Sequence, residues 1–144
     1  MASLELEGLD DLLKAFDNIS EIPEDVQKDA LTEMGELSRE FIKSEGEALG
    51  VRDDESSVHI LDKLTLKKPK IKKEGSYLDI TFAGSRRRGK SSTRNAEIAF
   101  INEYGKRNQL ARPFIGVAMT KNAEKITDAG AKVIANWMER EFKK

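Results

Sequence analysis

The spacing of the apolar residues changes from a helical period to a period of two and back again along this chain. Over 23–49 and again over 113–142, apolar side chains recur every three or four residues, as they do on one face of an α-helix. Between 61 and 83 they alternate with polar residues, as in a half-buried strand. Separate helical and strand blocks are typical of the α+β class. We therefore predict a small antiparallel β-sheet packed by two N-terminal helices and a long C-terminal helix.

The N-terminal part is predicted to contain a short strand at 3–7, a helix at 9–19 and a second helix at 23–49. Two glycines interrupt the second helix, and each costs about 1 kcal/mol relative to alanine. We expect Gly35 to allow close packing and Gly46 to mark fraying. The predicted core stripe of the second helix is Val26, Ala30, Met34, Leu37 and Phe41, extended by Ala48 or Leu49.

The block with a period of two predicts an antiparallel hairpin whose strands are joined by a turn at 72–76. Its buried face carries Leu64 and Leu66 from the first strand and Leu78, Ile80 and Phe82 from the second. The residues that follow, 84–95, contain no aliphatic side chain and are rich in Gly, Ser and Arg. That composition predicts a flexible basic loop.

The apolar spacing of 96–105 fits both a period of two and a helical period. We favour a short helix that ends at Gly105, because glycine readily adopts the left-handed conformation that follows a helix. After a loop at 106–112, Pro113 opens the last helix, since proline is tolerated in a first helical turn. The predicted core stripe of this helix is Ile115, Ala118, Met119, Asn122, Ile126, Ala129, Val133, Ile134 and Trp137. A chain of 144 residues has the length of one ordinary domain, so we predict a single domain over 1–144.

The net charge of −1 conceals a strong asymmetry along the chain. Residues 1–62 carry 5 Lys/Arg against 18 Asp/Glu, a net of −13. Residues 63–94 carry 11 against 2, a net of +9, and residues 95–144 carry 9 against 6, a net of +3. An acidic first part and a basic middle would let the molecule stack on copies of itself or approach a charged partner.

The side chains that most enzymes and metal sites require are scarce. The absence of cysteine excludes disulfides, cysteine–zinc sites and thiol catalysis. His59 is the only histidine, so the serines of 84–95 have no plausible base beside them. Asp53, Asp54 and Glu55 lie near His59, but a solvated turn is a better interpretation than a metal site. We predict a protein that is not an enzyme and that holds no cofactor or metal.

The loop at 84–95 carries five basic residues that could contact a partner, and we call them the basic arm: Arg86, Arg87, Arg88, Lys90 and Arg94. Neutralising phosphates would give them a salt-dependent affinity that does not depend on sequence. The arm contains no aromatic residue on which bases could stack. Two interpretations stay open: a nucleic-acid-binding module that uses the segment 63–94, and a solvated arm that meets an acidic protein surface.

The stretch NEYGKRNQLARPF, residues 102–114, contains two groups of special residues around a variable loop. These are Glu103, Tyr104 and Gly105 before the loop, and Ala111, Pro113 and Phe114 after it. In these residues, in Gly-Leu-Asp at 8–10 and in the order of its elements, the chain resembles one family. That family comprises small tail-component or head–tail joining (neck, tail-completion) proteins of long-tailed bacteriophages and prophages. The chain departs from the family pattern at Lys106, where threonine is usual.

The resemblance implies a structural protein of the virion, located in the tail or at the head–tail junction and made in the host bacterial cytoplasm. The implied partners are copies of the chain in a ring, with a hexamer as the candidate size, and other phage neck or tail proteins. The basic arm could also contact DNA in the channel without sequence preference. No apolar run approaches the roughly 20 residues that span a bilayer, and the N-terminus does not resemble a signal peptide. We therefore expect no membrane partner.

Overall fold

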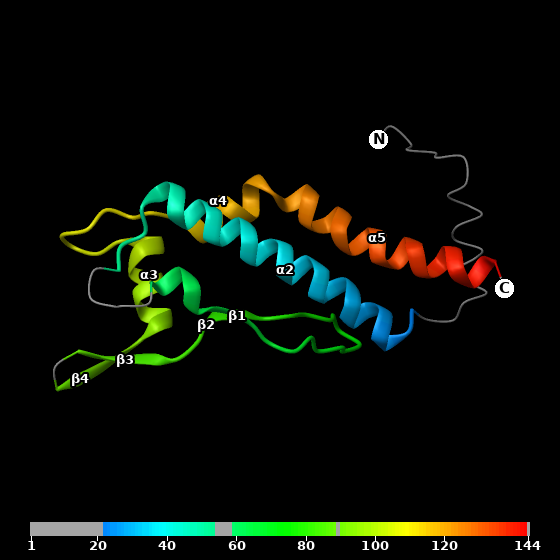
Figure 1. The fold of residues 1–144 in the computed structure, drawn as a ribbon, viewed down its shortest axis with the longest axis horizontal. Coiled ribbons are helices and arrows are strands. Elements are labelled where there is room, and N and C mark those ends of the chain that lie inside the picture. Colours follow the sequence, from blue (N-terminus) through cyan, green and yellow to red (C-terminus); the bar gives the residue numbers. More distant parts are fainter. Residues whose placement is uncertain (1–21, 54–58, 89, 144) are drawn as a thin grey trace.

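The structure is a computed structural model that describes residues 22–53, 59–88 and 90–143. The predicted strand at 3–7 and helix at 9–19 lie outside these ranges. The described elements are α2 (Glu24–Leu49), the 3-10 helix η1 (Ile60–Lys63), β1 (Leu64–Leu66), β2 (Ile80–Phe82), β3 (Ser85–Arg88), β4 (Ser91–Arg94), α3 (Asn95–Tyr104), α4 (Phe114–Lys121) and α5 (Ala123–Phe142). The predicted α+β class is therefore confirmed. Figure 1 shows an elongated molecule in which α2 and α5 run side by side in opposite directions.

The long helix α2 begins one residue after the predicted start and ends as predicted, with Gly50 in the left-handed conformation (φ 69°, ψ 46°). Its buried stripe is Val26, Ala30, Gly35, Ser38, Ile42 and Gly46, whereas Ala48 and Leu49 are exposed. The predicted extension to Ala48 or Leu49 was therefore wrong. The expectation of fraying at Gly46 was also wrong, because Gly46 is buried against η1. A Cβ at that position would lie only 2.5 Å from Cδ2 of Leu61.

The C-terminal helical region is divided into α4 and α5 by Asn122, not continuous as predicted. Asn122 has a non-helical backbone (φ −115°, ψ 13°), and its buried Nδ2 donates to the carbonyl oxygen of Ala118 at 2.9 Å. The N–H of Asn122 donates to the same oxygen at 3.2 Å, so the Ala118 carbonyl is shared by the backbone and the side chain of Asn122 at the break. Farther along, α5 approaches α2 at Gly130, where an added Cβ would clash with Sδ of Met34.

The hairpin formed by β1 and β2 is antiparallel, as predicted, with Leu64 opposite Phe82 and Leu66 opposite Ile80. Leu64 and Phe82 are both buried. A second hairpin, β3–β4, lies within the segment 84–95 that we predicted to be a loop, and Ser85 pairs with Arg94 at its base. The side chains on both strands are polar, so this hairpin lacks the alternation that identifies a half-buried strand.

The larger core cluster lies where α2, α3, α4, η1 and both strands of the first hairpin meet. Its buried members are Ile42, Val51, Ile60, Leu61, Leu64, Phe82, Ile98, Ala99, Phe114 and Ala118. A smaller cluster of Val26, Trp137 and Met138 joins the other end of α2 to α5. The larger cluster fixes α3 and α4, which carry Glu103, Tyr104 and Phe114 at the two ends of the stretch 102–114.

Candidate functional site

The candidate site is the joint between α3 and α4, residues 102–116. Glu103, near the end of α3, turns its carboxylate toward the start of α4. Its two oxygens accept hydrogen bonds from the backbone N–H of Ile115 at 2.8 Å and of Gly116 at 2.9 Å. The first N–H groups of a helix have no partner within the helix, and a carboxylate there also complements the helix dipole. Glu103 therefore caps α4 from a different helix.

Gly105 ends α3 as predicted, but not in the left-handed conformation that we expected. Its angles are φ 79° and ψ 178°, a region that is essentially restricted to glycine. A Cβ here would lie 2.8 Å from the carbonyl oxygen of Gln109 and 2.9 Å from the nitrogen of Ala111. Beyond Gly105, Lys106 and Gln109 pair through two backbone hydrogen bonds of 3.0 Å. The predicted loop at 106–112 thus begins with a tight turn, and the backbone of Gln109 and Ala111 lies close to Gly105.

Pro113 and Phe114 position the start of α4. Pro113 has φ −74° and ψ 62°, and the N–H of Phe114 donates to the carbonyl oxygen of Arg112 at 2.7 Å. These values define an inverse γ-turn, so the helix starts at Phe114 and not at Pro113 as predicted. The Phe114 side chain is completely buried and meets Phe82 edge to face, with ring centroids 6.0 Å apart. Ala111 and Tyr104, the other two residues of the signature, are exposed.

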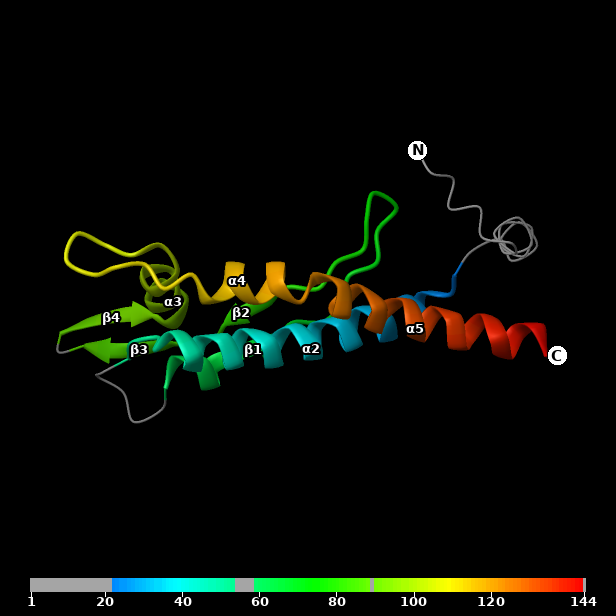
Figure 2. The ribbon, with the colours of Figure 1, turned by 90° about the horizontal axis from the view of Figure 1, so that it is seen from above.

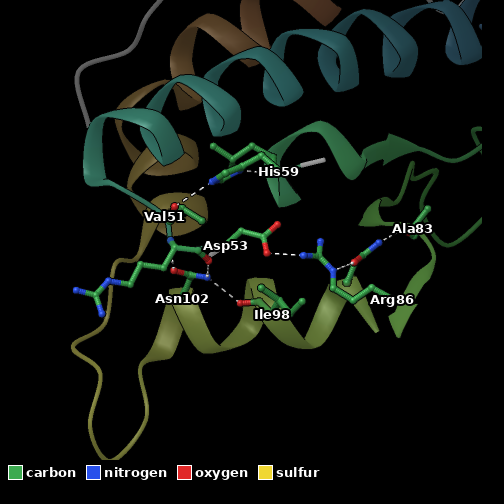
Figure 3. A network of polar contacts seen from close by, with 10 residues as sticks. Val51, Asp53, His59, Ala83, Arg86, Ile98 and Asn102 are labelled. Carbon is green, nitrogen blue, oxygen red and sulfur yellow. Dashed lines mark hydrogen bonds and ion pairs between the residues drawn. The ribbon is translucent and has the colours of Figure 1, made fainter. Parts of the chain in front are cut away.

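Asn102 connects this joint to the chain that follows α2 (Figure 3). Its Oδ1 accepts from the N–H of Arg52 at 2.8 Å, and its Nδ2 donates to the carbonyl oxygens of Arg52 and Ile98, each at 3.0 Å. The backbone N–H of Arg112 in turn donates to the carbonyl oxygen of Asn102 at 2.6 Å. Asn102 is buried, so its amide replaces water for both polar groups of Arg52.

Arg86, which we assigned to the basic arm, is directed into the molecule (Figure 3). Its guanidinium forms an ion pair with Asp53, and its Nε donates to Oδ1 of Asn95 at 3.0 Å. The Asp53 side chain has no exposed surface and that of Arg86 is 11% exposed. Asn95 also donates from Nδ2 to the carbonyl oxygen of Ala83 at 2.7 Å. Arg86 thus anchors the β3–β4 hairpin and is not available as a free cation.

The other described side chains of the basic arm are at the surface. Arg87 and Lys90 are exposed. Arg94 is exposed as well, and its Nε pairs with Glu97 at 3.3 Å. The side chain of Arg88 lies outside the described part of the molecule. The arm is therefore a hairpin that presents Arg87, Lys90 and Arg94 to solvent.

Of the residues for which we expected a solvated turn, Asp53 and His59 are held by contacts with the rest of the fold. His59 lies with one ring nitrogen, Nε2, 3.1 Å from the carbonyl oxygen of Val51, and its Nδ1 accepts from the N–H of Leu61 at 3.2 Å (Figure 3). The carboxylate of Asp53 forms an ion pair with Arg86, and Asp54 and Glu55 lie outside the described residues. Within the described ranges, no three His, Cys, Asp or Glu side chains gather to hold a metal ion.

Sequence reasoning missed an exposed aromatic pair on α3. Phe100 and Tyr104 are 61% and 69% exposed, and their ring centroids are 4.7 Å apart. Phe100 also lines a shallow hollow with Arg94 and Glu97, so the pair adjoins the basic hairpin. The signal was present, because the two aromatics are four residues apart on a helix whose opposite face is already buried. Large exposed aromatic surfaces often mark interaction sites.

The helices of the described residues include none that is both long and apolar enough to cross a bilayer. Compared with models of protein families, with curated proteins and with solved structures, the chain has no match in any of the three.

Proposed function

We propose that this chain is a non-enzymatic structural protein of a long-tailed bacteriophage or prophage. It would act in the virion, at the head–tail junction or at the end of the tail. It works by assembly with copies of itself, as in a ring, and with other neck or tail proteins. The observation that carries the proposal is the joint at 102–116, where the family signature has a role in backbone geometry. Glu103 caps α4, Gly105 permits the turn and Phe114 anchors the helix in the core.

The aromatic pair Phe100–Tyr104 supports assembly as the mode of action. The pair lies on the solvent side of α3, whose other side is packed into the larger core cluster. Arg87, Lys90 and Arg94 lie on the adjoining hairpin, and the acidic surface of α2 belongs to the same molecule. A contact that joins the basic hairpin of one copy to the acidic helix of the next would be head to tail, and such contacts form rings when they close.

Complementation of a phage or prophage that lacks this gene tests the proposal. Particles made without the protein should show separate heads and tails by negative-stain electron microscopy, and wild-type protein supplied in trans should restore joined virions. The double variant Phe100→Asp, Tyr104→Asp should fail to restore them, because carboxylates oppose burial of the pair. Thr120→Asp, on the exposed surface of α4, is the matched control and should complement. Normal virions in the absence of the protein would refute the proposal.

The second candidate is a nucleic-acid-binding module that uses the basic segment 63–94. It is favoured by the exposed positions of Arg87 and Lys90, together with the exposed lysines Lys67, Lys68, Lys70, Lys72 and Lys73 of the first hairpin. The variant Arg87→Ala, Lys90→Ala should weaken binding to duplex DNA and reduce its salt slope by up to about two phosphate equivalents. Lys132→Ala, an exposed change on α5, should leave both unchanged. No measurable binding at low salt would remove this candidate.

A further inference from the structure

A groove with an apolar lining runs beside the N-terminal half of α2. It has a volume of about 830 Å³. Its lining includes Ala30, Leu31 and Met34 from α2, Ala131 and Ile134 from α5, and Ile71 from the tip of the first hairpin. Figure 1 shows α5 and this hairpin on opposite sides of α2, and in Figure 2 the hairpin tip projects away from the two helices. Several of the lining side chains are only half-buried, so apolar surface stays open to water.

The chain that leads into α2 enters at this groove. Ile22, the first described residue, is part of the lining, and residues 1–21 precede it. The spacing of Leu9, Leu12, Leu13, Phe16 and Ile19 predicts an amphipathic helix over 9–19. Only residues 20–23 separate that helix from α2. Two helices joined by a connection of 2–5 residues characteristically form an antiparallel hairpin, so a helix over 9–19 would lie along the first turns of α2.

The dimensions of the segment and the groove agree. A helix of 11 residues, 9–19, is about 16 Å long at 1.5 Å per residue. The part of α2 that lines the groove extends from Glu24 to Met34, which is also 11 residues and about 16 Å of helix. The apolar stripe of the segment thus has the length of the surface that it would cover.

The chemistry of α2 decides which of its sides the segment can occupy. The side of α2 that faces solvent has no apolar surface on which a stripe of leucines could pack. Its exposed residues are Lys28, Asp29, Thr32 and Glu33. The groove is apolar, and Lys72 and Lys73 of the hairpin line it as well. The segment 9–19 carries Asp10, Asp11 and Asp17 against Lys14, so its net negative charge complements those lysines.

We propose that residues 9–19 of the same chain pack into this groove as an amphipathic helix. The segment thereby completes the core between α2, α5 and the first hairpin, next to the small cluster of Val26, Trp137 and Met138. This inference is independent of the proposed function, because it concerns the fold of a single subunit.

The absence of native cysteine makes thiol labelling of the full chain a clean test. Leu31→Cys places a reporter in the groove, and Glu33→Cys places a control on the exposed side of the same helix. Each cysteine is introduced into two chains, one otherwise wild type and one that also carries Leu12→Asp and Phe16→Asp. The rate at which the thiol reacts with a soluble disulfide reagent is then measured for each protein. The Leu31→Cys thiol should react at least about tenfold faster when the segment carries the two aspartates, because covered sites react only on opening. The Glu33→Cys thiol should react at the same rate in both chains.

A second pair of cysteine variants keeps the test valid if the Leu31→Cys variant does not fold. Ala131→Cys lies on the α5 wall of the groove and Lys132→Cys lies beside it on the exposed surface. The Ala131→Cys thiol should react faster when the segment carries the two aspartates, and the Lys132→Cys thiol should react at the same rate in both chains. Equal rates for the groove thiols with and without the aspartates would overturn the proposal. Protection that disappears on dilution would also overturn it, because the groove would then be covered by a second copy.

Discussion

Glu103 and Ile115 are twelve residues apart in the sequence, and the carboxylate of the first accepts the backbone N–H of the second at 2.8 Å. The other oxygen of the same carboxylate accepts the N–H of Gly116 at 2.9 Å. Pro113, which directly precedes α4, supplies no side-chain cap to the helix. The orientation of α4 relative to α3 therefore depends on this carboxylate and on the burial of Phe114.

Replacing Glu103 by Ala should lower the free energy of unfolding by about 1–2 kcal/mol, because two N–H groups lose their acceptor and the helix dipole loses its counter-charge. Glu103→Gln keeps one acceptor oxygen and should lose less. Glu74→Ala, an exposed glutamate in the turn of the first hairpin, is the matched control and should change stability by no more than about 0.5 kcal/mol. Urea unfolding followed by circular dichroism measures all three. A Glu103→Ala variant as stable as wild type would contradict the capping role.

Gly105 and Gly50 both have positive φ, yet they should respond differently to substitution. Gly50 is left-handed with no heavy atom within 4 Å of an added Cβ, so Gly50→Ala should cost about 1–2 kcal/mol from the backbone alone. Gly105→Ala adds contacts of 2.8 and 2.9 Å with backbone atoms and should cost at least about 1 kcal/mol more than Gly50→Ala. Asparagine should be tolerated at position 50 but not at 105. Equal thermal stabilities of the two alanine variants would refute this account.

The sequence predicted those features that burial imposes locally. Val26 and Ala30 on α2, Ile126 and Trp137 on α5, and Leu64 and Phe82 in the first hairpin are buried as predicted, because the core accepts one face of each element. Met34, Leu37 and Phe41 of the predicted α2 stripe are only half-buried, and Met119 is exposed. The hairpin β3–β4 could not be predicted in this way. It is held by backbone pairing and by the Arg86–Asp53 ion pair, whose members are 33 residues apart.

The candidate site was predicted in its position but not in its contacts. The signature residues from Glu103 to Phe114 marked this stretch, and Gly105 ends α3 as expected, although not in the left-handed conformation. The hydrogen bonds of Asn102 could not be predicted from the sequence, because its backbone partner Arg52 is 50 residues away. A buried amide has no periodic signal, and its partners are determined only by the assembled fold.

Asn102 should be among the residues least tolerant of substitution. Asn102→Leu leaves the part-buried N–H and carbonyl oxygen of Arg52 without their partner, at a cost of about 1–3 kcal/mol. Asn102→Asp should cost more, because a carboxylate would face two carbonyl oxygens. Asn108→Ala, on the exposed turn, should change stability by no more than about 0.5 kcal/mol. Chemical denaturation curves of wild type and the three variants test this order, and an Asn102→Leu variant as stable as Asn108→Ala would contradict it.

Arg86 and Arg87 are neighbours in the sequence with opposite roles. Arg86→Ala leaves Asp53 buried without its cation, and breaking such a pair typically costs about 3–5 kcal/mol. Arg87→Ala should leave stability unchanged, because the side chain is exposed. Adding Asp53→Asn to Arg86→Ala should recover part of the loss by removing the unpaired charge. Melting temperatures of the single and double variants measure this, and a double variant no more stable than Arg86→Ala would contradict it.

Lys43 and Asp62 form an ion pair between α2 and η1, with 2.9 Å between Nζ and Oδ1. The hydrogen bond between them, followed by their charge attraction, lowers the pKa of Asp62 below its ordinary value of 3.8 and raises the pKa of Lys43 above 10.5. A lowered carboxyl pKa stabilises the fold above pH 3.8, and this stabilisation is lost as the pH falls through the lowered pKa. A raised lysine pKa stabilises it below pH 10.5, and that is lost as the pH rises through the raised value.

The variant Lys43→Met should therefore return the pKa of Asp62 toward 3.8 and leave the fold otherwise intact. The side chains are 46% and 50% exposed, so water and salt screen the pair and its effect on stability should be small. Titration of the Asp62 carboxyl carbon by NMR measures the pKa directly. Lys121→Met, which removes the pair with Glu45 at the other side of α2, is the matched control and should leave the pKa of Asp62 unchanged. An Asp62 pKa that stays low in the Lys43→Met variant would show that another group stabilises the carboxylate.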